Sequence, residues 1–354
     1  MKKNTLFAIL LILSSVVCLN LSSKESNLPR AVSNNAVTSA ELEGQEIIFS
    51  FSGLTNGKTY KDIISTGYSY NTQTNETKTL SNLADGLGRL ASIAVTINNR
   101  ILVIGGYTVA KDHSEKSTPE IVEYLPETNS YKLITEMPVP VDDTVALTYK
   151  NRYLYLVSGW FDVDNVSLVQ VYDLKENIWF NATPFPGTPV FGHAGGIVDN
   201  RMLIADGVKV IKRIEGKRVY GPSDENWLGT IHQSNPKIIN WEKIIKHPFK
   251  PHYRMASTGV KSKKLILFAG GSDNPYNFNG IGYDGNPSKP SNHLFGYDLI
   301  SNQWKIFKNK PLASMDHRGL IENNDKLYIL GGMGDKQKVL SDIQIFELVE
   351  RTEE

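Results

Sequence analysis

The sequence is nearly free of cysteine, since Cys18 is the only one in 354 residues. A folded domain without paired cysteines has no disulfide, so its stability must come from buried apolar surface. Neither sign of charge is in excess, because 38 Lys and Arg stand against 37 Asp and Glu. A chain with this balance has no overall field to hold a polyanion, which argues against nucleic acid as a partner.

The common motifs of metal, redox, nucleotide and serine hydrolase sites are also missing. No HExxH, CxxC, phosphate-binding loop or Gly-x-Ser-x-Gly segment occurs. His247 and His252 lie in KHPFKPH, where prolines interrupt the segment and no third ligand is near. We therefore expect a loop at these histidines, and we predict neither a metal nor a cofactor.

Long apolar runs are rare and the clearest one is at the N-terminus. Lys2 and Lys3 precede a largely apolar run over 6–19, and a more polar stretch follows over 20–23. The run is too short for a membrane-spanning helix and is typical of a secretory signal peptide. We expect residues 1–23 to be this leader and the protein to act outside the cytoplasm, in the periplasm or secreted.

Cys18 at the end of the leader leaves two interpretations open. It could be the lipidated residue of a bacterial outer-membrane lipoprotein, or an apolar residue of a discarded peptide. Val17 directly before it is larger than the residue that lipoprotein cleavage sites prefer. Beyond such an anchor, we expect no segment that spans a membrane.

A short apolar strand that ends on glycine recurs six times along the chain. The copies are EIIFSFSG, ILVIGG, YLYLVSG, RMLIADG, KLILFAGG and KLYILGG, ending at Gly53, Gly106, Gly159, Gly207, Gly271 and Gly332. Successive final glycines are 53, 53, 48, 64 and 61 residues apart, a period that fits one four-stranded propeller blade with its loops. We predict a single all-β domain, a six-bladed β-propeller with four antiparallel strands per blade, over residues 24–349, and a charged tail over 350–354.

Two further features support a closed ring. An aromatic residue on the third strand is followed seven residues later by one on the fourth, in the pairs Tyr124 and Tyr131, Tyr172 and Trp179, and Tyr297 and Trp304. We expect these rings to pack between neighbouring sheets. The sixth unit lacks an outer strand, and we expect the segment around 28–32 to supply it and so close the ring.

These motifs resemble the kelch repeat, and the resemblance covers nearly all of residues 28–348, with the first and fourth units degenerate. It implies a β-propeller and says little about function. In length, blade number and leader the chain is most similar to secreted sialic-acid mutarotases, the N-acetylneuraminate epimerases. The related galactose oxidases need a cysteine cross-linked to a copper-ligating tyrosine. The propeller part of this chain has no cysteine, so the resemblance does not extend to that copper chemistry.

Residues just before each innermost strand should point at a common axial site. Counting back from the glycines gives Asn35, Arg89, Asp143, Thr144, His193, Arg254, His317 and Arg318. Arginines can hold a carboxylate through forked hydrogen bonds, and histidine titrates near neutral pH. The alternative is structural, with arginines fixing blade junctions and histidines packed as polar residues.

The two longest excursions follow the fourth and fifth glycines. The first, KVIKRIEGKRVYGPSDEN, is strongly charged. The second, 273–292, leaves directly after Gly270 and Gly271 and should lie over the same channel mouth. Its aromatic, amide and carboxyl groups suit a sugar, or alternatively form an ordered cap; they are Tyr276, Asn277, Asn279, Tyr283 and Asp284.

Two functions therefore stay open. The first is a small, anionic carbohydrate bound at the axis, with mutarotase-like isomerisation in which His193 and His317 exchange protons while Arg89 and Arg254 hold the carboxylate. Only Asp143 and Asp316 are expected as carboxylates near the axis, and the lack of a closer pair weakens this hypothesis. The second is a non-catalytic propeller whose loops bind a glycan or a protein.

Overall fold

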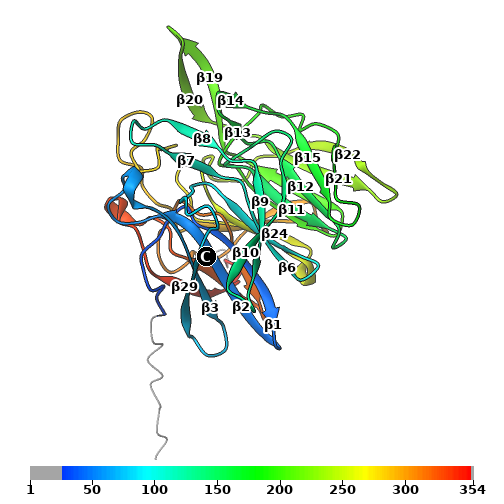
Figure 1. Ribbon diagram of the computed structural model, residues 1–354. Helices are drawn as coiled ribbons and strands as arrows, with labels where there is room; N and C mark the ends of the chain where they lie inside the picture. The colour runs from blue at the N-terminus through cyan, green and yellow to red at the C-terminus, as the bar shows by residue number, and fades with distance from the viewer. Residues whose placement is uncertain (1–25, 352–354) are drawn as a thin grey trace, which may run out of the picture.

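The computed structural model describes residues 26–351, and the prediction of a six-bladed ring is confirmed (Figure 1). The proposed leader over 1–23 and Cys18 lie outside the described residues.

Blade 1 consists of β1 (Ala36–Leu42), β2 (Gln45–Leu54), β3 (Ile63–Asn71) and β4 (Thr77–Asn82). Blade 2 consists of β5 (Ile93–Ile97), β6 (Arg100–Ile104), β9 (Glu120–Leu125) and β10 (Ser130–Glu136). Blade 3 consists of β11 (Val145–Tyr149), β12 (Tyr153–Val157), β15 (Val169–Asp173) and β16 (Ile178–Asn181).

The second half of the chain repeats this order. Blade 4 consists of β17 (Ala194–Val198), β18 (Arg201–Ala205), β21 (Asn226–His232) and β22 (Asn235–Ile244). Blade 5 consists of β23 (Ala256–Val260), β24 (Leu265–Ala269), β25 (Leu294–Asp298) and β26 (Gln303–Ile306). Blade 6 has β27 (Ile321–Asn323), β28 (Lys326–Leu330) and β29 (Ile343–Glu347). Three short 3₁₀ turns complete the described secondary structure, at Tyr60–Asp62, Lys261–Lys263 and Asp335–Gln337.

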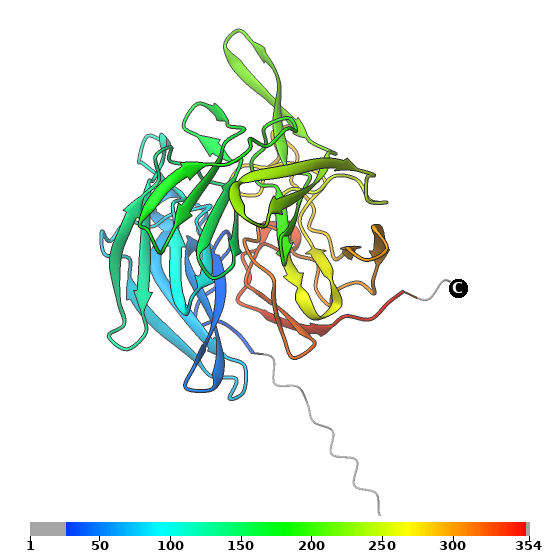
Figure 2. The same ribbon diagram turned by 90° about the vertical axis from the view of Figure 1, so that its right-hand side faces the viewer.

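The first described residues supply the missing edge of blade 6, as expected. Leu28 N donates to Ser341 O at 2.7 Å and Ile343 N donates to Ser26 O at 3.0 Å. The blue first blade and the red last blade lie side by side in Figure 2, and Tyr70 of β3 packs with Tyr328 of β28. Because this pairing covers the outer edge of β29, the ring closes without an open sheet edge at that point.

The paired aromatic residues lie between neighbouring blades, which confirms their structural role. Tyr124 and Tyr131 pack against Phe51 of blade 1, with ring centroids 5.5 and 6.2 Å apart. Trp179 of blade 3 donates its indole N–H to Thr135 Oγ1 of blade 2 at 3.0 Å. The hydrophobic core is thus divided among the interfaces between sheets, and each blade is stabilised by its neighbours.

The final glycine of each repeat is required by close packing against the linker that enters the blade. Gly106 has φ of 93°, and a Cβ there would overlap Ser92 Oγ and lie 2.6 Å from Leu90 O. Gly44, in the β1–β2 turn, also has positive φ, at 75°, but a Cβ added there would meet no atom within 4 Å. Two reasons therefore favour glycine at position 106: the backbone is left-handed, and there is no space for a side chain.

Replacing Gly106 with alanine should lower the free energy of unfolding by about 2–3 kcal/mol, because left-handed strain and a backbone clash add together. The matched change Gly44→Ala carries the strain alone and should cost about 1 kcal/mol. Urea unfolding followed by tryptophan fluorescence measures both. Equal costs at the two positions would show that the close approach to Ser92 has no energetic weight.

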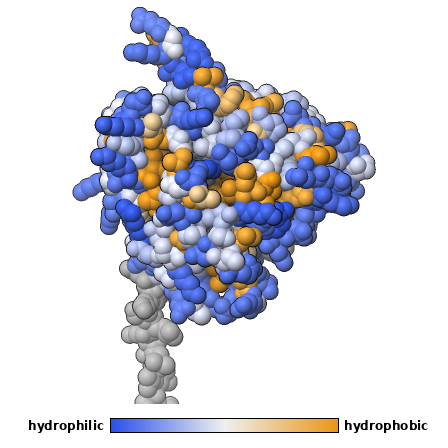
Figure 3. Space-filling model, in the orientation of Figure 1, coloured by the Kyte–Doolittle hydropathy of each residue, from blue (hydrophilic) through white to orange (hydrophobic). Residues whose placement is uncertain are grey.

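Hairpins inserted after the second strands gather at one face of the ring. They are β7–β8 (Tyr107–Val109 and Glu115–Ser117), β13–β14 (Trp160–Phe161 and Asp164–Asn165) and β19–β20 (Val208–Ile214 and Lys217–Pro222). The last, which we call the arm, projects at the top of Figure 1 and is mostly hydrophilic in Figure 3. The charged insertion of the fourth unit is therefore an ordered hairpin.

Candidate functional site

Six corresponding residues, one in each linker to an innermost strand, form a constriction that we call the neck ring. All have φ between 50° and 66°: Asn34, Ala91, Asp143, Gly192, Arg254 and Asp316. Backbone N–H groups around the ring donate to carbonyls of adjacent linkers: Asn34 to Asp316 at 2.9 Å, Asp143 to Ala91 at 3.3 Å, Gly192 to Asp143 at 2.8 Å and Arg254 to Gly192 at 2.8 Å. The Asn34 side chain accepts from Ala91 N at 2.7 Å. The ring separates a mouth pocket from the central channel.

A buried ion network stabilises the neck ring from within. Arg254 Nη2 lies 2.5 Å from Asp143 Oδ2, and its Nη1 lies 2.9 Å from Asp316 Oδ1. Arg318 forms a second ion pair with Asp143 and donates to Asn34 Oδ1 at 2.9 and 3.0 Å. Burial opposes ionisation of Asp143, but the two guanidinium groups outweigh it and hold its pKa below the usual value. These charges are already neutralised by one another.

The mouth pocket lies above this network and has a volume of about 410 Å³. Seven of the fifteen residues that line it are aromatic: Tyr107, Trp160, Phe191, Tyr220, Tyr276, Phe278 and Tyr283. Tyr220 of the arm packs on Tyr283 of the 270–293 loop, with ring centroids 4.5 Å apart. The size and the aromatic wall fit a ligand no larger than a few sugar rings.

Asp142 is the buried acid of this pocket. Its Oδ2 accepts a hydrogen bond from Ser117 Oγ at 2.6 Å, and only 3% of the residue is exposed. Burial, reinforced by the neighbouring Asp143 carboxylate, raises the pKa of Asp142 well above its usual value. The environment therefore favours the protonated form of Asp142, which lines the pocket, and the ionised form of the adjacent Asp143; carboxyl groups whose pKa values are pushed apart are typical of acid–base sites.

The pocket also contains a cation that no carboxylate neutralises. Arg218 of β20 lies over Trp160, with its guanidinium carbon 4.9 Å from the ring centroid. Among residues 26–351 it is in no ion pair, and its buried Nε has no hydrogen-bond partner. The guanidinium can thus donate hydrogen bonds to an acceptor group of a ligand.

The 270–293 loop lies at the mouth, as expected, but contributes fewer residues than expected. Tyr276, Asn277 and Tyr283 line the pocket, and the buried Tyr276 hydroxyl has no hydrogen-bond partner there. Asn279 and Asp284 instead hold the loop together, since Asn279 Oδ1 accepts from Ile281 N at 3.0 Å and Asp284 Oδ1 from Asn286 N at 2.9 Å. These two act as parts of an ordered cap.

The expectation that Arg89 and Arg254 hold a ligand carboxylate together does not agree with the structure. Arg89 forms ion pairs with Asp85 at 2.5 Å and Glu120 at 3.2 Å, and lines neither the mouth pocket nor the central channel. Arg254 does line the mouth pocket, but Asp143 and Asp316 bind its guanidinium. Both arginines fix blade junctions, which is the structural alternative to ligand binding.

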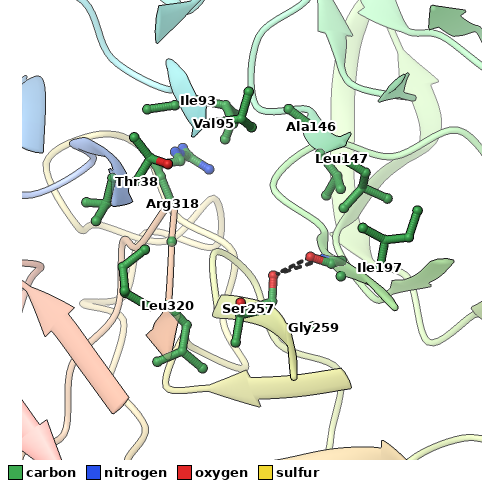
Figure 4. Close-up of a pocket in the computed structure, with 18 of the residues that line it drawn as sticks. Thr38, Ile93, Val95, Ala146, Leu147, Ile197, Ser257, Gly259, Arg318 and Leu320 are labelled. Carbon is green, nitrogen blue, oxygen red and sulfur yellow. Dashed lines mark hydrogen bonds between the residues drawn. The ribbon is translucent and has the colours of Figure 1, made fainter. Parts of the chain in front are cut away.

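His193, His317 and Arg318 lie on the other side of the neck ring and line the central channel. The channel, about 340 Å³, is surrounded by the innermost strands, and Figure 4 shows Ile93, Leu147, Ile197 and Leu320 around it. Thr144 also lines the channel and donates to Ser158 O at 2.9 Å. Asn35 lines neither the channel nor the mouth pocket; it donates to Ser50 Oγ at 2.8 Å and to Leu330 O of blade 6 at 3.3 Å. One axial site shared by the histidines and Arg254 is therefore not formed.

Neither histidine is suited to proton exchange near neutral pH. His193 Nε2 donates to Val157 O at 2.8 Å, and burial lowers its pKa to about 4. His317 Nε2 lies 2.8 Å from Ser314 Oγ, and burial together with the nearby Lys310 holds its pKa well below the usual value. Both imidazoles are neutral at pH 7, so the carboxyl groups of the mouth pocket replace them as the candidate catalytic pair.

An NMR titration should show His193 uncharged down to about pH 5. Because its folded pKa is depressed, the unfolded chain takes up a proton that the folded chain does not, and stability falls as the pH drops from about 6.5 toward 4. His193→Gln keeps a donor for Val157 O and should flatten this part of the stability profile. A normal titration near pH 6.5 would contradict the burial of this ring.

Four important pocket residues were not anticipated from the sequence: Glu115, Asp142, Arg218 and Tyr220. Asp142 immediately precedes the predicted Asp143, and the run of two aspartates just before an innermost strand was an available signal. Arg218 and Tyr220 lie in the charged insertion, whose sequence was not interpreted as alternating apolar and polar residues of strands. The lack of a pair of carboxyl groups near the site had weakened the isomerase hypothesis. Glu115 and Asp142 supply such a pair in the mouth pocket.

Searches with protein-family models give no match to this chain. The fold and the site define a class all the same: the chain is a kelch-type β-propeller with a polar, aromatic pocket at its loop-bearing mouth. Within residues 26–351 there is no helix long and apolar enough to cross a membrane. The same residues contain no group of three His, Cys, Asp or Glu side chains placed to hold a metal ion.

Among curated proteins, the chain is similar to Kelch-like protein 15 of Mus musculus, at 23% identity over 247 residues. That match covers 67% of this chain and 37% of the relative, so the chain spans just over a third of the relative's length. It is also similar to N-acetylneuraminate epimerase of Salmonella typhi, at 21% identity over 310 residues, which cover 74% of this chain and 77% of the epimerase.

A solved structure, that of YjhT, shares the fold. It matches with a TM-score of 0.69 at 14% identity and covers 90% of this chain and 98% of its own. The chain is therefore a kelch-repeat propeller that is distantly similar in sequence to the epimerase and shares its fold with YjhT.

Proposed function

We propose that the mouth pocket binds a small, anionic carbohydrate and interconverts its anomers. The observation that supports this most is the combination, in one aromatic pocket, of the buried Asp142, whose pKa is raised, with the guanidinium of Arg218, which is in no ion pair within the described part of the chain. Aromatic faces pack on the apolar sides of sugar rings, and a guanidinium binds a carboxylate through two hydrogen bonds. The similarity to N-acetylneuraminate epimerase points to a sugar acid.

Mutarotation needs only an acid and a base, and the pocket offers both. Asp142 donates its proton to the ring oxygen while a base removes the proton of the anomeric hydroxyl, so the ring C–O bond breaks and a carbonyl forms. Glu115, which lines the same pocket, is the base in this scheme. Glu115 keeps an exposed surface, but partial removal of its carboxyl group from water raises its pKa; Arg254 opposes this shift and Asp143 adds to it. A carboxylate of raised pKa is a stronger base. Rotation of the open chain about the bond between the carbonyl carbon and its former ring neighbour, followed by reversal of both proton transfers, gives the other anomer.

Exchange NMR on N-acetylneuraminic acid and neutral sugars tests the proposal with the full chain. We expect faster anomer exchange for the sugar acid than for the neutral sugars, and a thermal shift that disappears in Arg218→Ala. The matched control is Arg213→Ala, also in the arm, where Arg213 pairs with the exposed Asp164. If no sugar binds, the alternative becomes the better hypothesis: a non-catalytic propeller whose loops bind a protein, the role that the Kelch-like relatives suggest. The proposed place of action outside the cytoplasm rests on the leader pattern alone.

A further inference from the structure

A larger cavity lies on the face opposite to the mouth pocket, between blades 1 and 2. Its volume is about 680 Å³, within the range of ligand sites. Four hairpin turns line it, those between β1 and β2, β3 and β4, β5 and β6, and β9 and β10. The mouth hairpins instead follow the second strands and leave from the other ends of the blades. We call this second cavity the rear cavity.

The floor of the rear cavity is apolar. Ile47 and Phe49 of β2, Leu80 of β4 and Tyr124 of β9 line it, and all four belong to the interface between blades 1 and 2. The Tyr124 hydroxyl is satisfied by Asn129 Oδ1 at 3.0 Å. A ligand therefore meets the apolar sides of these residues, and its own apolar group would gain from leaving water.

The rim of the rear cavity is acidic. It carries four exposed glutamates and one lysine: Glu41, Glu43, Glu76, Glu127 and Lys78. None of these side chains is in an ion pair among residues 26–351. The carboxylates repel one another and attract a cation, and they come from three separate turns around the opening.

We propose that the rear cavity binds a basic segment of a partner protein, with an apolar side chain on the floor and cationic side chains at the rim. The acidic rim favours a ligand with positive charges. Because the carboxylates lie on three separate turns, these charges should stand on both sides of the ligand's apolar group. Lysine and arginine reach such a rim while their backbone stays above the floor. A compact amine would leave the apolar floor in contact with water. This inference is independent of the sugar site.

Calorimetric titration of the full chain with acetyl-Lys-Leu-Lys-Leu-Lys-amide tests the proposal. Binding should be stronger than for acetyl-Lys-Ser-Lys-Ser-Lys-amide, which lacks the apolar group, and absent for acetyl-Glu-Leu-Glu-Leu-Glu-amide. The double variant Glu43→Gln, Glu127→Gln should weaken binding about fivefold, since each exposed ion pair contributes about 0.2–1 kcal/mol. Raising the salt to about 0.5 M should weaken it further.

The matched control is Glu215→Gln with Glu347→Gln, which removes two exposed glutamates elsewhere on the surface and should leave the affinity unchanged. Equal affinity for the leucine and serine peptides would overturn the role of the floor. Spermidine binding as tightly as the leucine peptide would make this an amine site and overturn the peptide assignment. If the chain instead self-associates, and the double variant Glu43→Gln, Glu127→Gln abolishes this association, the occupant is a second copy of the chain. That result would contradict the proposal of a different partner protein.

Discussion

Replacing Asp143 with alanine should lower the free energy of unfolding by about 3–5 kcal/mol, because it leaves two buried guanidinium groups without their shared partner. Arg254 and Arg318 are each only 3% exposed as side chains and both contact this carboxylate. Arginine cannot lose its charge to relieve the burial. Arg254 keeps Asp316, whereas Arg318 keeps only the neutral Asn34 oxygen.

Thermal and urea unfolding of the full chain measure this cost, and Asp164→Ala provides the comparison. Asp164 also pairs with an arginine, Arg213, but both side chains are nearly half exposed. Exposed pairs contribute about 0–1 kcal/mol, so this variant should resemble the wild type. If Asp143→Ala were as mild as Asp164→Ala, the network would not hold the neck ring together.

The fold could be predicted from the sequence because each blade repeats a local pattern. The strand β1 coincides with the alternating segment AVTSAEL, and β9 coincides with EIVEYL. Alternation, a terminal glycine and a paired aromatic residue recur in most blades, so an error in one unit is corrected by the others. Closure by the N-terminal segment followed from the single strand missing in the sixth unit.

The site was harder to predict because it depends on register. The neck-ring residue lies 15 positions before the final glycine in blade 2, from Ala91 to Gly106, but 19 positions before it in blade 1, from Asn34 to Gly53. Strand and turn lengths differ between blades, so counting back selected Arg89 and His193, which lie two residues before the ring and one after it. One residue decides whether a side chain faces the mouth, the channel or the blade interior.

The arm and the 270–293 loop could not be predicted from sequence patterns for a different reason. The hairpins β7–β8 and β13–β14 that correspond to the arm are shorter, and the loop forms no such hairpin, so no sequence repeat supports a prediction of either structure. The arm's inward residues, Arg218 and Tyr220, gain their positions from contacts with Trp160 and Tyr283 that are distant in sequence. Only the folded ring brings these segments together.

Replacing Asp142 with asparagine should slow anomer exchange of a bound sugar acid by about 10²–10⁴-fold, the usual contribution of a general acid. Asparagine keeps an oxygen for the Ser117 hydroxyl but has no proton of suitable acidity. Substrate affinity, measured by calorimetry, should change little because Arg218 and the aromatic wall are unaltered. Asp164→Asn, on the β13–β14 hairpin but outside the pocket, should leave the rate unchanged.

The pH dependence of stability gives this prediction a second readout. The folded chain keeps a proton on Asp142 that the unfolded chain releases above its ordinary pKa of about 3.9, so this residue's contribution to stability declines as the pH rises through the raised pKa. Asparagine cannot ionise, and the variant should be at least as stable as the wild type at neutral pH. A variant that lost stability and sugar binding together would show instead that Asp142 only supports the pocket wall. Slow exchange with unchanged binding and undiminished stability requires that Asp142 transfers the proton, because no structural role of the carboxyl group produces that combination.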